Sequence, residues 1–167
     1  MGSNIDSQRN MQRAAQQLAA HCTLLALSPV YQTAPVGKTD QPPFLNAAAW
    51  IETDLSAAEL KEQVLQPIEH ALGRVRGTDK NAPRTIDLDI TLFNDQVMQI
   101  GQRHIPDPEL VQHAHIAIPL ADLAPQYRHP ETGQTLRQIA DRLANTTDIQ
   151  RIQFEWHLPY GDIELET

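Results

Sequence analysis

The chain has 167 residues, of which 41% are hydrophobic and 20% are charged, a composition typical of one globular domain. With 13 basic and 21 acidic side chains it is not expected to bind nucleic acid, because domains that grip the phosphate backbone are usually basic. No apolar run reaches the ~20 residues of a membrane helix, and the start of the chain lacks the basic and apolar regions of a signal peptide. The single cysteine, Cys22, cannot form an internal disulfide, which suits a reducing cytoplasm. We expect a cytoplasmic monomer without membrane or nucleic-acid partners.

The first part of the chain predicts a helix followed by two strands. The helix begins at Asp6 or Ser7, either of which can cap it, and a strand follows over 23–33. After a proline-containing loop over 33–43, residues 44–51 alternate as a half-buried strand. The residues expected to face the core are Met11, Ala14, Ala15 and Leu18 in the helix and Leu45, Ala47, Ala49 and Ile51 in the second strand.

A second helix is predicted to open at a capping box, in which Glu59 follows Ser56 by three residues, and to end before Gly73. Its apolar stripe consists of Leu60, Val64, Ile68, Ala71 and Leu72. Pro67 falls inside this helix, where it should kink the backbone at a cost of roughly 3 kcal/mol unless packing compensates.

The second half of the chain predicts a long strand over 84–93, with residues 96–100 paired to it across a turn at Asn94 and Asp95. Pro108 suits the first turn of a short helix. A last helix is marked by Leu136, Ile139, Ala140 and Leu143.

The tail after Gln150 has no periodicity. The order of elements predicts an α+β fold in which helices pack on one face of an antiparallel sheet. We expect residues 1–167 to form a single domain.

Two aspartates share one face of the strand predicted over 84–93. The two-residue period places Ile86, Leu88, Ile90 and Leu92 on one face and Thr85, Asp87, Asp89 and Thr91 on the other. Strands disfavour aspartate, and carboxylates whose Cα atoms lie ~6.7 Å apart repel unless a cation sits between them. Magnesium ions held by Asp87 and Asp89 and completed by substrate phosphates explain the pattern. A solvated polar strand face explains it equally well.

Basic residues gather near these aspartates in the sequence: Arg74, Arg76, Lys80 and Arg84. The planar guanidinium of arginine suits phosphate oxygens, and a loop can bring several of them onto a developing charge. A scattered basic surface is the alternative.

Five segments follow one another in a specific order: Gly2-Ser3-Asn4, Tyr31-Gln32-Thr33-Ala34-Pro35-Val36-Gly37, Phe44-Leu45-Asn46-Ala47, Ile68-Glu69 leading to Gly73-Arg74-Val75-Arg76, and Lys80-Asn81-Ala82-Pro83-Arg84-Thr85-Ile86-Asp87-Leu88-Asp89-Ile90. Together they resemble the 6-hydroxymethyl-7,8-dihydropterin pyrophosphokinase family. The resemblance covers about 2–125 and leaves 126–167 as a C-terminal helix and an acidic tail. It implies a ferredoxin-like α+β fold and the transfer of pyrophosphate from ATP to the hydroxymethyl group of the dihydropterin, giving AMP and the pterin diphosphate in folate biosynthesis.

The resemblance also implies roles for single residues, with ATP as co-substrate and two Mg²⁺ ions as cofactors. Asp87 and Asp89 match the metal-binding aspartates. Catalytic contacts to ATP or its phosphates are implied for Arg74, Arg76 and Arg84, and positions near the nucleotide for Gln66, Glu69, Ile90 and His113. For Gln66 and Glu69, a surface role on the helix is equally consistent with the sequence.

A pterin is a flat heterocycle with a donor–acceptor edge, so it requires aromatic faces and an amide that pairs with that edge. Asn46 resembles the family's pterin-binding asparagine, and Phe44 takes the place of one stacking aromatic residue. The loop that lines the ring is matched by Thr33, Ala34 and Val36. His115 stands where many members carry the second stacking aromatic, which an imidazole can replace.

The sequence also departs from the family pattern. Asn81 replaces a loop tryptophan of some members, Asp107 stands where many have histidine, and His113 stands where many have arginine. In the family an apolar central strand precedes the Gly-Ser-Asn segment, whereas here Met1 directly precedes Gly2. We therefore expect this first strand to be missing from the given sequence and the natural protein to start upstream.

Two further functions are compatible with the sequence. One is a catalytically impaired relative that binds pterin or nucleotide and acts as a regulator, which the altered positions favour and the intact aspartates oppose. The other is an acidic ferredoxin-like interaction module, which would not need Asn46 together with the aspartate pair.

Overall fold

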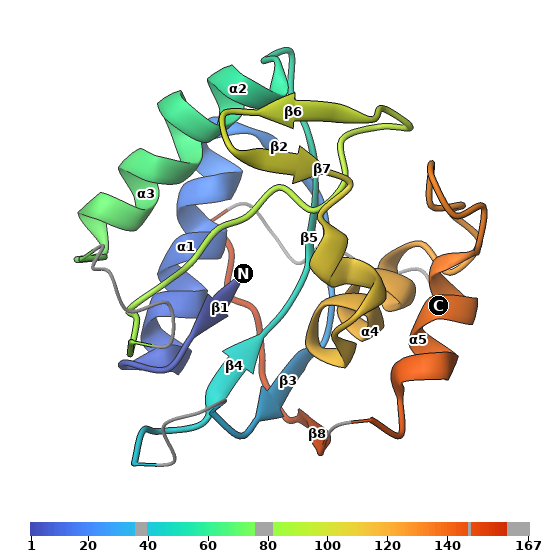
Figure 1. The fold of residues 1–167 in the computed structure, drawn as a ribbon. Helices are drawn as coiled ribbons and strands as arrows, with labels where there is room; N and C mark the ends of the chain where they lie inside the picture. The colour runs from blue at the N-terminus through green and yellow to red at the C-terminus, as the bar shows by residue number, and fades with distance from the viewer. Residues whose placement is uncertain (36–39, 76–81, 147, 160–167) are drawn as a thin grey trace.

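The computed structural model describes residues 1–35, 40–75, 82–146 and 148–159 (Figure 1). The strands are β1 (Gly2–Ser3), β2 (Thr23–Leu27), β3 (Val30–Thr33), β4 (Phe44–Asn46), β5 (Ala49–Glu52), β6 (Met98–Ile100), β7 (Arg103–Ile105) and β8 (Ile149–Ile152). The helical elements are α1 (Ser7–His21), α2 (Ala57–Glu59), the π-helix η1 (Leu60–Leu65), α3 (Gln66–Ala71), the 3₁₀-helix η2 (Pro108–Val111), α4 (Ala114–Leu123) and α5 (Leu136–Leu143). Within this described part of the chain, no helix has both the length and the apolar character needed to cross a lipid bilayer.

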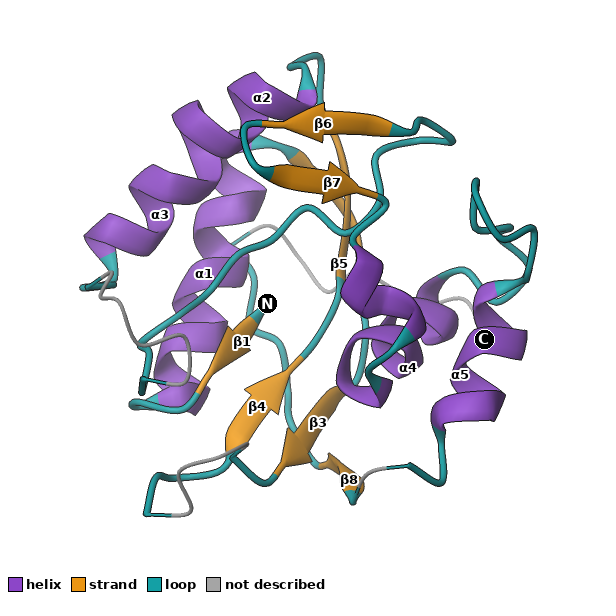
Figure 2. Cartoon of the chain, viewed as in Figure 1, coloured by secondary structure: helices purple, strands orange, loops and turns teal. Residues whose placement is uncertain are grey.

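Strands and helices combine in the predicted α+β manner (Figure 2). The central sheet has the order β1-β4-β3-β8, and all of its pairs are antiparallel. Two further antiparallel pairs, β2 with β5 and β6 with β7, stand beside it. The expected antiparallel sheet is therefore confirmed.

The strands predicted over 23–33 and 44–51 are each broken in the middle, which corrects the prediction of two continuous strands. Pro29 has no backbone N–H to donate to a ladder, so β2 and β3 are separate. At the same level of the facing strand, the Ser28 N–H donates to the Ala48 carbonyl (3.0 Å) and the Ala48 N–H donates to Ser28 Oγ (2.9 Å). These two bonds satisfy the backbone at the break, and the two halves of each strand join different sheets.

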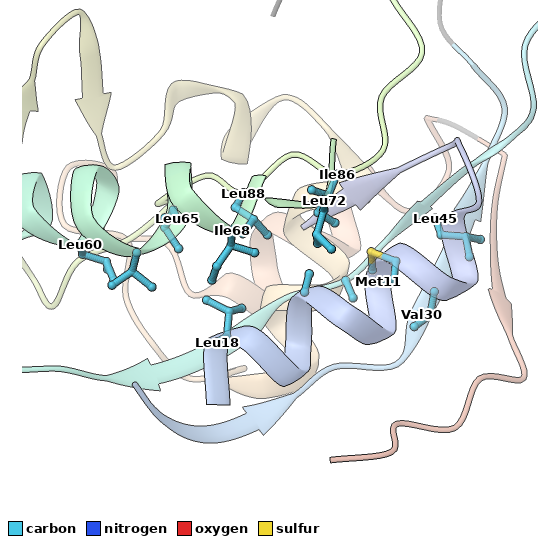
Figure 3. Close-up of a cluster of buried hydrophobic side chains, with 13 residues drawn as sticks. Met11, Leu18, Val30, Leu45, Leu60, Leu65, Ile68, Leu72, Ile86 and Leu88 are labelled. Atoms are coloured by element: carbon cyan, nitrogen blue, oxygen red, sulfur yellow. The ribbon is translucent and has the colours of Figure 1, made fainter. Parts of the chain in front are cut away.

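A first hydrophobic core lies between α1, the helical run from α2 to α3 and one face of the central sheet (Figure 3). Its buried members are Met11, Ala14, Leu18, Val30, Leu45, Ala47, Leu60, Val64, Leu65, Ile68, Leu72, Ile86 and Leu88. The predicted apolar positions of α1 and of residues 44–51 are therefore confirmed as core positions, since Ala49 and Ile51 also pack against this cluster. The side-chain cap expected at Asp6 is absent, because Asp6 is in the left-handed region with φ 43° and makes no such bond.

The second predicted helix begins at its capping box, where both reciprocal bonds between Ser56 and Glu59 are present. It ends at Ala71, two residues before Gly73, whose φ of 78° is readily adopted by glycine. Pro67 does not interrupt an α-helix, because the preceding turn is the π-helix η1 and the proline falls in the first turn of α3. The change from π-helix to α-helix directly before Pro67 is a break in the regular i to i−4 bonding, the place at which a proline is best tolerated.

A second hydrophobic core joins α4 and α5, and its buried residues are Leu110, Ala114, Ala117, Ala121, Leu136, Ile139, Ala140 and Leu143. The sequence prediction missed α4, which contains Pro119. The predicted helices pack on one face of the central sheet. The helix α4, which was not predicted, lies on the other face. Val30 faces the first core, while the next residue, Tyr31, donates its hydroxyl to Asp122 of α4 (2.6 Å).

Two predictions for the second half of the chain are wrong. Residues 84–93 form an extended segment that joins the sheet by a single bridge, between Asp87 and Gly2, because the neighbouring strand β1 has only two residues. The hairpin lies between β6 and β7, around Gly101 with φ 58°, and not across Asn94.

The tail also differs from its prediction, because β8 pairs with β3 as the fourth strand of the sheet. After it, Phe154 and Trp156 pack against the first core, and Trp156 donates its ring N–H to the Ser28 carbonyl (3.1 Å).

The start of the chain forms β1, which stands next to β4 at one end of the strand order of the central sheet (Figure 1). Gly2 is paired with Asn46 of β4 on one side and with Asp87 on the other. Only Gly2–Ser3 are assigned to this strand.

Candidate active site

Asp87 is held by its backbone in the centre of the molecule. Its N–H donates to the Gly2 carbonyl (2.8 Å), and its carbonyl accepts from the Gly2 N–H (3.0 Å). Its carboxylate accepts from Arg84 Nη1 (2.8 Å) and lies 3.7 Å from Arg74 Nε. Burial by itself would raise the pKa of Asp87, but the charges of Arg84 and Arg74 outweigh it and hold this pKa below its ordinary value.

Asp89 has two different cationic partners. Its Oδ1 lies 3.3 Å from Lys61 Nζ and also accepts a short hydrogen bond from Arg103 Nη1. Lys61 comes from η1 and Arg103 from β7, so the carboxylate joins two elements that are far apart in the sequence. The Lys61 ammonium also donates to the Leu88 carbonyl (3.0 Å). The sequence prediction singled out neither Lys61 nor Arg103.

The peptide between the two aspartates is anchored by Glu69. The Glu69 side chain is only 2% exposed, and its Oε1 accepts from the Leu88 N–H (2.8 Å). The surface role considered for Glu69 is therefore wrong, because this carboxylate lies in the interior and fixes the backbone that presents Asp87 and Asp89.

The Gly-Ser-Asn segment fixes the start of the same backbone stretch. Ser3 Oγ donates to the Thr85 carbonyl (2.5 Å), and Asn4 Oδ1 accepts from the Arg84 N–H (2.8 Å). The amide nitrogen of Asn4 donates to the Pro42 carbonyl (3.3 Å). Sequence reasoning missed these positioning roles, although the polar pair directly after Gly2 belongs to the pattern that resembles the family.

The residues predicted for the pterin site lie around β3 and β4. Asn46 is buried and donates its amide N–H to Thr33 Oγ1 (3.0 Å), which fixes the orientation of the amide. The guanidinium of Arg84 lies over the Phe44 ring, 5.5 Å from its centroid, which is the geometry of a cation–π contact. Predicted phosphate and pterin residues therefore meet at Arg84 and Phe44. Ala34 is exposed at the end of β3.

His113 and His115 stand at the start of α4 and stack on each other with ring centroids 5.3 Å apart. Burial, followed by the charge of His113, lowers the pKa of His115 to about 4. A pKa this low favours the neutral form of the His115 ring at physiological pH. His113 is exposed.

A cavity of about 250 Å³ adjoins Asp89, and its walls come from η1, α3 and the β6–β7 hairpin. Two of the residues predicted near the nucleotide, Gln66 and Ile90, line it together with Lys61 and Arg103. The structure thus brings Gln66 and Ile90 to one cavity, whereas it places Glu69 behind the aspartates. The predicted residues Arg76 and Val36, and also Lys80 and Asn81, lie outside the described residues.

Taken together, the site presents two carboxylates on a rigidly anchored segment, each facing basic groups. Beside them lie an aromatic ring and an oriented amide on one side and a cavity on the other. Across residues 1–35, 40–75, 82–146 and 148–159, no three His, Cys, Asp or Glu side chains gather into a complete metal site. Any divalent ion at Asp87 and Asp89 would therefore need its remaining ligands from water or a substrate.

Comparison with known proteins gives a family for this arrangement. Residues 1–125 match the model of the 7,8-dihydro-6-hydroxymethylpterin-pyrophosphokinase family. The 2-amino-4-hydroxy-6-hydroxymethyldihydropteridine pyrophosphokinase of Pseudomonas aeruginosa is 38% identical over 142 residues, which cover 83% of this chain and 86% of that protein. The enzyme of the same name from Bacillus subtilis is 38% identical over 146 residues, 86% of each chain. A folic acid synthesis protein of Dictyostelium discoideum is 32% identical over 152 residues, 90% of this chain but 23% of that protein.

Proposed function

The chain belongs to the 7,8-dihydro-6-hydroxymethylpterin-pyrophosphokinase family, and on this premise we propose how its residues perform the reaction. The protein is an ATP-dependent pyrophosphokinase of folate biosynthesis. The pterin hydroxymethyl oxygen loses its proton to solvent and forms a bond to the β-phosphorus of ATP. The bond between that phosphorus and the α–β bridging oxygen breaks, and AMP leaves with that oxygen. The single observation that carries the residue assignment is the anchored segment bearing Asp87 and Asp89 beside the cavity. A regulator without activity is not favoured.

Asp87 and Asp89 are the residues that would hold Mg²⁺, two ions in all. Carboxylate oxygens completed by phosphate oxygens and water are the ligands this ion prefers. A further observation fits a triphosphate here: the buried Nε of Arg74 has no hydrogen-bond partner within the described residues, although it points toward Asp87. When bound, the ions supply positive charge to the oxygens of the transferred group.

The remaining roles follow from the positions of the side chains. Arg84, with Arg74, supplies guanidinium donors to the phosphates and changes partners from Asp87 to substrate oxygens. The oriented amide of Asn46 pairs with the pterin edge, and Phe44 with His115 stacks on the ring faces. Contacts of Arg76, Glu69 and His113 with the nucleotide stay predictions. Independently of any such contact, the Glu69 carboxylate accepts a hydrogen bond from the Leu88 N–H.

Location in the cytoplasm, a monomeric state and a single domain over 1–167 also stay predictions. The packing of Phe154 and Trp156 against the first core supports the single domain.

The experiment is an assay of AMP release from ATP, Mg²⁺ and 6-hydroxymethyl-7,8-dihydropterin. We expect AMP only when all three are present, and loss of turnover on chelation of the metal. Asp141→Asn, an exposed charge change on α5, is the matched control for substitutions at Asp87 and Asp89. Turnover that persists in a chelator would remove the metal role of this pair.

A further inference from the structure

Asp89 is unusual among the carboxylates of the site because a buried lysine and a surface arginine share one of its oxygens. Lys61 Nζ lies 3.3 Å from Oδ1 and Arg103 Nη1 donates to the same atom. Asp87, by contrast, faces Arg84 and Arg74, which belong to the motif segments. Neither Lys61 nor Arg103 lies in any of these segments.

Lys61 is held in this place by its surroundings. Its side chain is only 12% exposed, and a buried ammonium is costly unless it is paired. The Leu88 carbonyl and the Asp89 carboxylate supply two acceptors for it. Arg103 is 49% exposed, so its contribution is more strongly screened by solvent.

We propose that Lys61 and Arg103 are positioning residues that form a counter-charge clamp on Asp89, holding its carboxylate while the nucleotide is absent and weakening its affinity for free divalent ions. The proposal rests on the metal role of Asp89 given above. Both side chains line the cavity of about 250 Å³ next to Asp89. A triphosphate entering there offers them anionic oxygens in exchange for the carboxylate.

The clamp makes binding of the divalent ion depend on the nucleotide. A cation already at Oδ1 must move before a metal can bind that oxygen, and the like charges of metal and ammonium repel. Removal of Lys61 should therefore tighten binding of a free ion. A purely structural role predicts the opposite, because a disordered site binds metal less well.

The test measures Mn²⁺ binding to the nucleotide-free protein from the electron paramagnetic resonance signal of the free ion. Lys61→Met, which removes the charge and shortens the side chain by one atom, should lower the Mn²⁺ dissociation constant roughly five- to tenfold. Arg103→Leu should lower it roughly twofold to threefold. Arg142→Leu, which removes an exposed charge from α5, is the control and should leave the dissociation constant unchanged. Unchanged or weaker Mn²⁺ binding in both Lys61→Met and Arg103→Leu overturns the proposal.

Two further variants keep the result interpretable. If circular dichroism shows that Lys61→Met does not fold, Lys61→Gln, which retains a donor for the Leu88 carbonyl, and the surface variant Arg103→Leu decide the question by the same criterion. The variant Asp89→Asn distinguishes the clamp proposal from the proposed metal role of Asp89. If Asp89→Asn lowers Mn²⁺ affinity while the Lys61 and Arg103 variants have no effect, the clamp is refuted and the metal role stands. If Asp89→Asn leaves Mn²⁺ binding intact, both are refuted.

Discussion

Glu69 should determine whether the aspartate segment is held in place, and its substitution gives a measurable loss of stability. In Glu69→Ala the buried Leu88 N–H loses the acceptor that stands 2.8 Å away. An orphaned buried donor costs about 1–3 kcal/mol, and Glu69 is only 2% exposed. Glu69→Gln keeps an oxygen acceptor at the same length and should lose less than half as much.

Urea unfolding measures this difference. With a slope of about 2 kcal/mol per molar urea, Glu69→Ala should lower the midpoint by about 0.5–1.5 M, with an unchanged slope. Because the segment carries Asp87 and Asp89, pyrophosphoryl transfer by the folded Ala variant should fall as well. An Ala variant as stable as the unmodified protein, or a Gln variant as damaged as the Ala variant, would refute the anchoring role.

Three further predictions concern the site. Asp87→Ala and Asp89→Ala should keep the fold by circular dichroism yet lower turnover at least about a hundredfold, because positioning of cations dominates phosphoryl transfer; near-normal activity contradicts the assignment. Asn46→Ala should weaken pterin binding in calorimetry by roughly 1–3 kcal/mol with ATP affinity preserved; equal losses for both ligands would make Asn46 structural. The pKa of His115 is lowered to about 4 in the folded protein, whereas an unperturbed histidine titrates at about 6.5. Between these two pH values the unfolded chain binds a proton that the folded protein excludes. The free energy of unfolding should therefore fall by up to about 3 kcal/mol as the pH is lowered from 6.5 toward 4. His115→Phe should remove that pH dependence in urea unfolding, and an identical dependence would refute it.

The elements predicted well from sequence are those stabilised by local patterns. The apolar spacing of α1 placed Met11 and Leu18 in the core, and the capping box at Ser56 located the start of the second helix. The alternation of Ile86 with Asp87 correctly predicted which side chains of this segment point into the core, although the segment is not a regular strand. Its pairing could not be predicted locally, because the partner strand β1 lies far away in the sequence and is only two residues long.

The missed features depend on contacts between distant residues. Strand β8 is only four residues long, and it forms because β3, more than a hundred positions earlier, offers an edge. Nothing in the spacing connects Lys61 to Asp89, 28 positions away. Glu69 gave no sign of burial, since only the folded chain shows the Leu88 N–H that its carboxylate satisfies.

At this site a pyrophosphoryl group is proposed to move as one unit from ATP to the pterin. Phosphorus-31 magnetic resonance of a reaction containing ATP, Mg²⁺ and 6-hydroxymethyl-7,8-dihydropterin follows that transfer directly. We expect AMP and the pterin diphosphate to appear in equal amounts, at a rate abolished in Asp89→Ala and unchanged in Asp141→Asn. Formation of ADP with a pterin monophosphate, or hydrolysis of ATP without any phosphorylated pterin, would show that the transfer does not occur in this way.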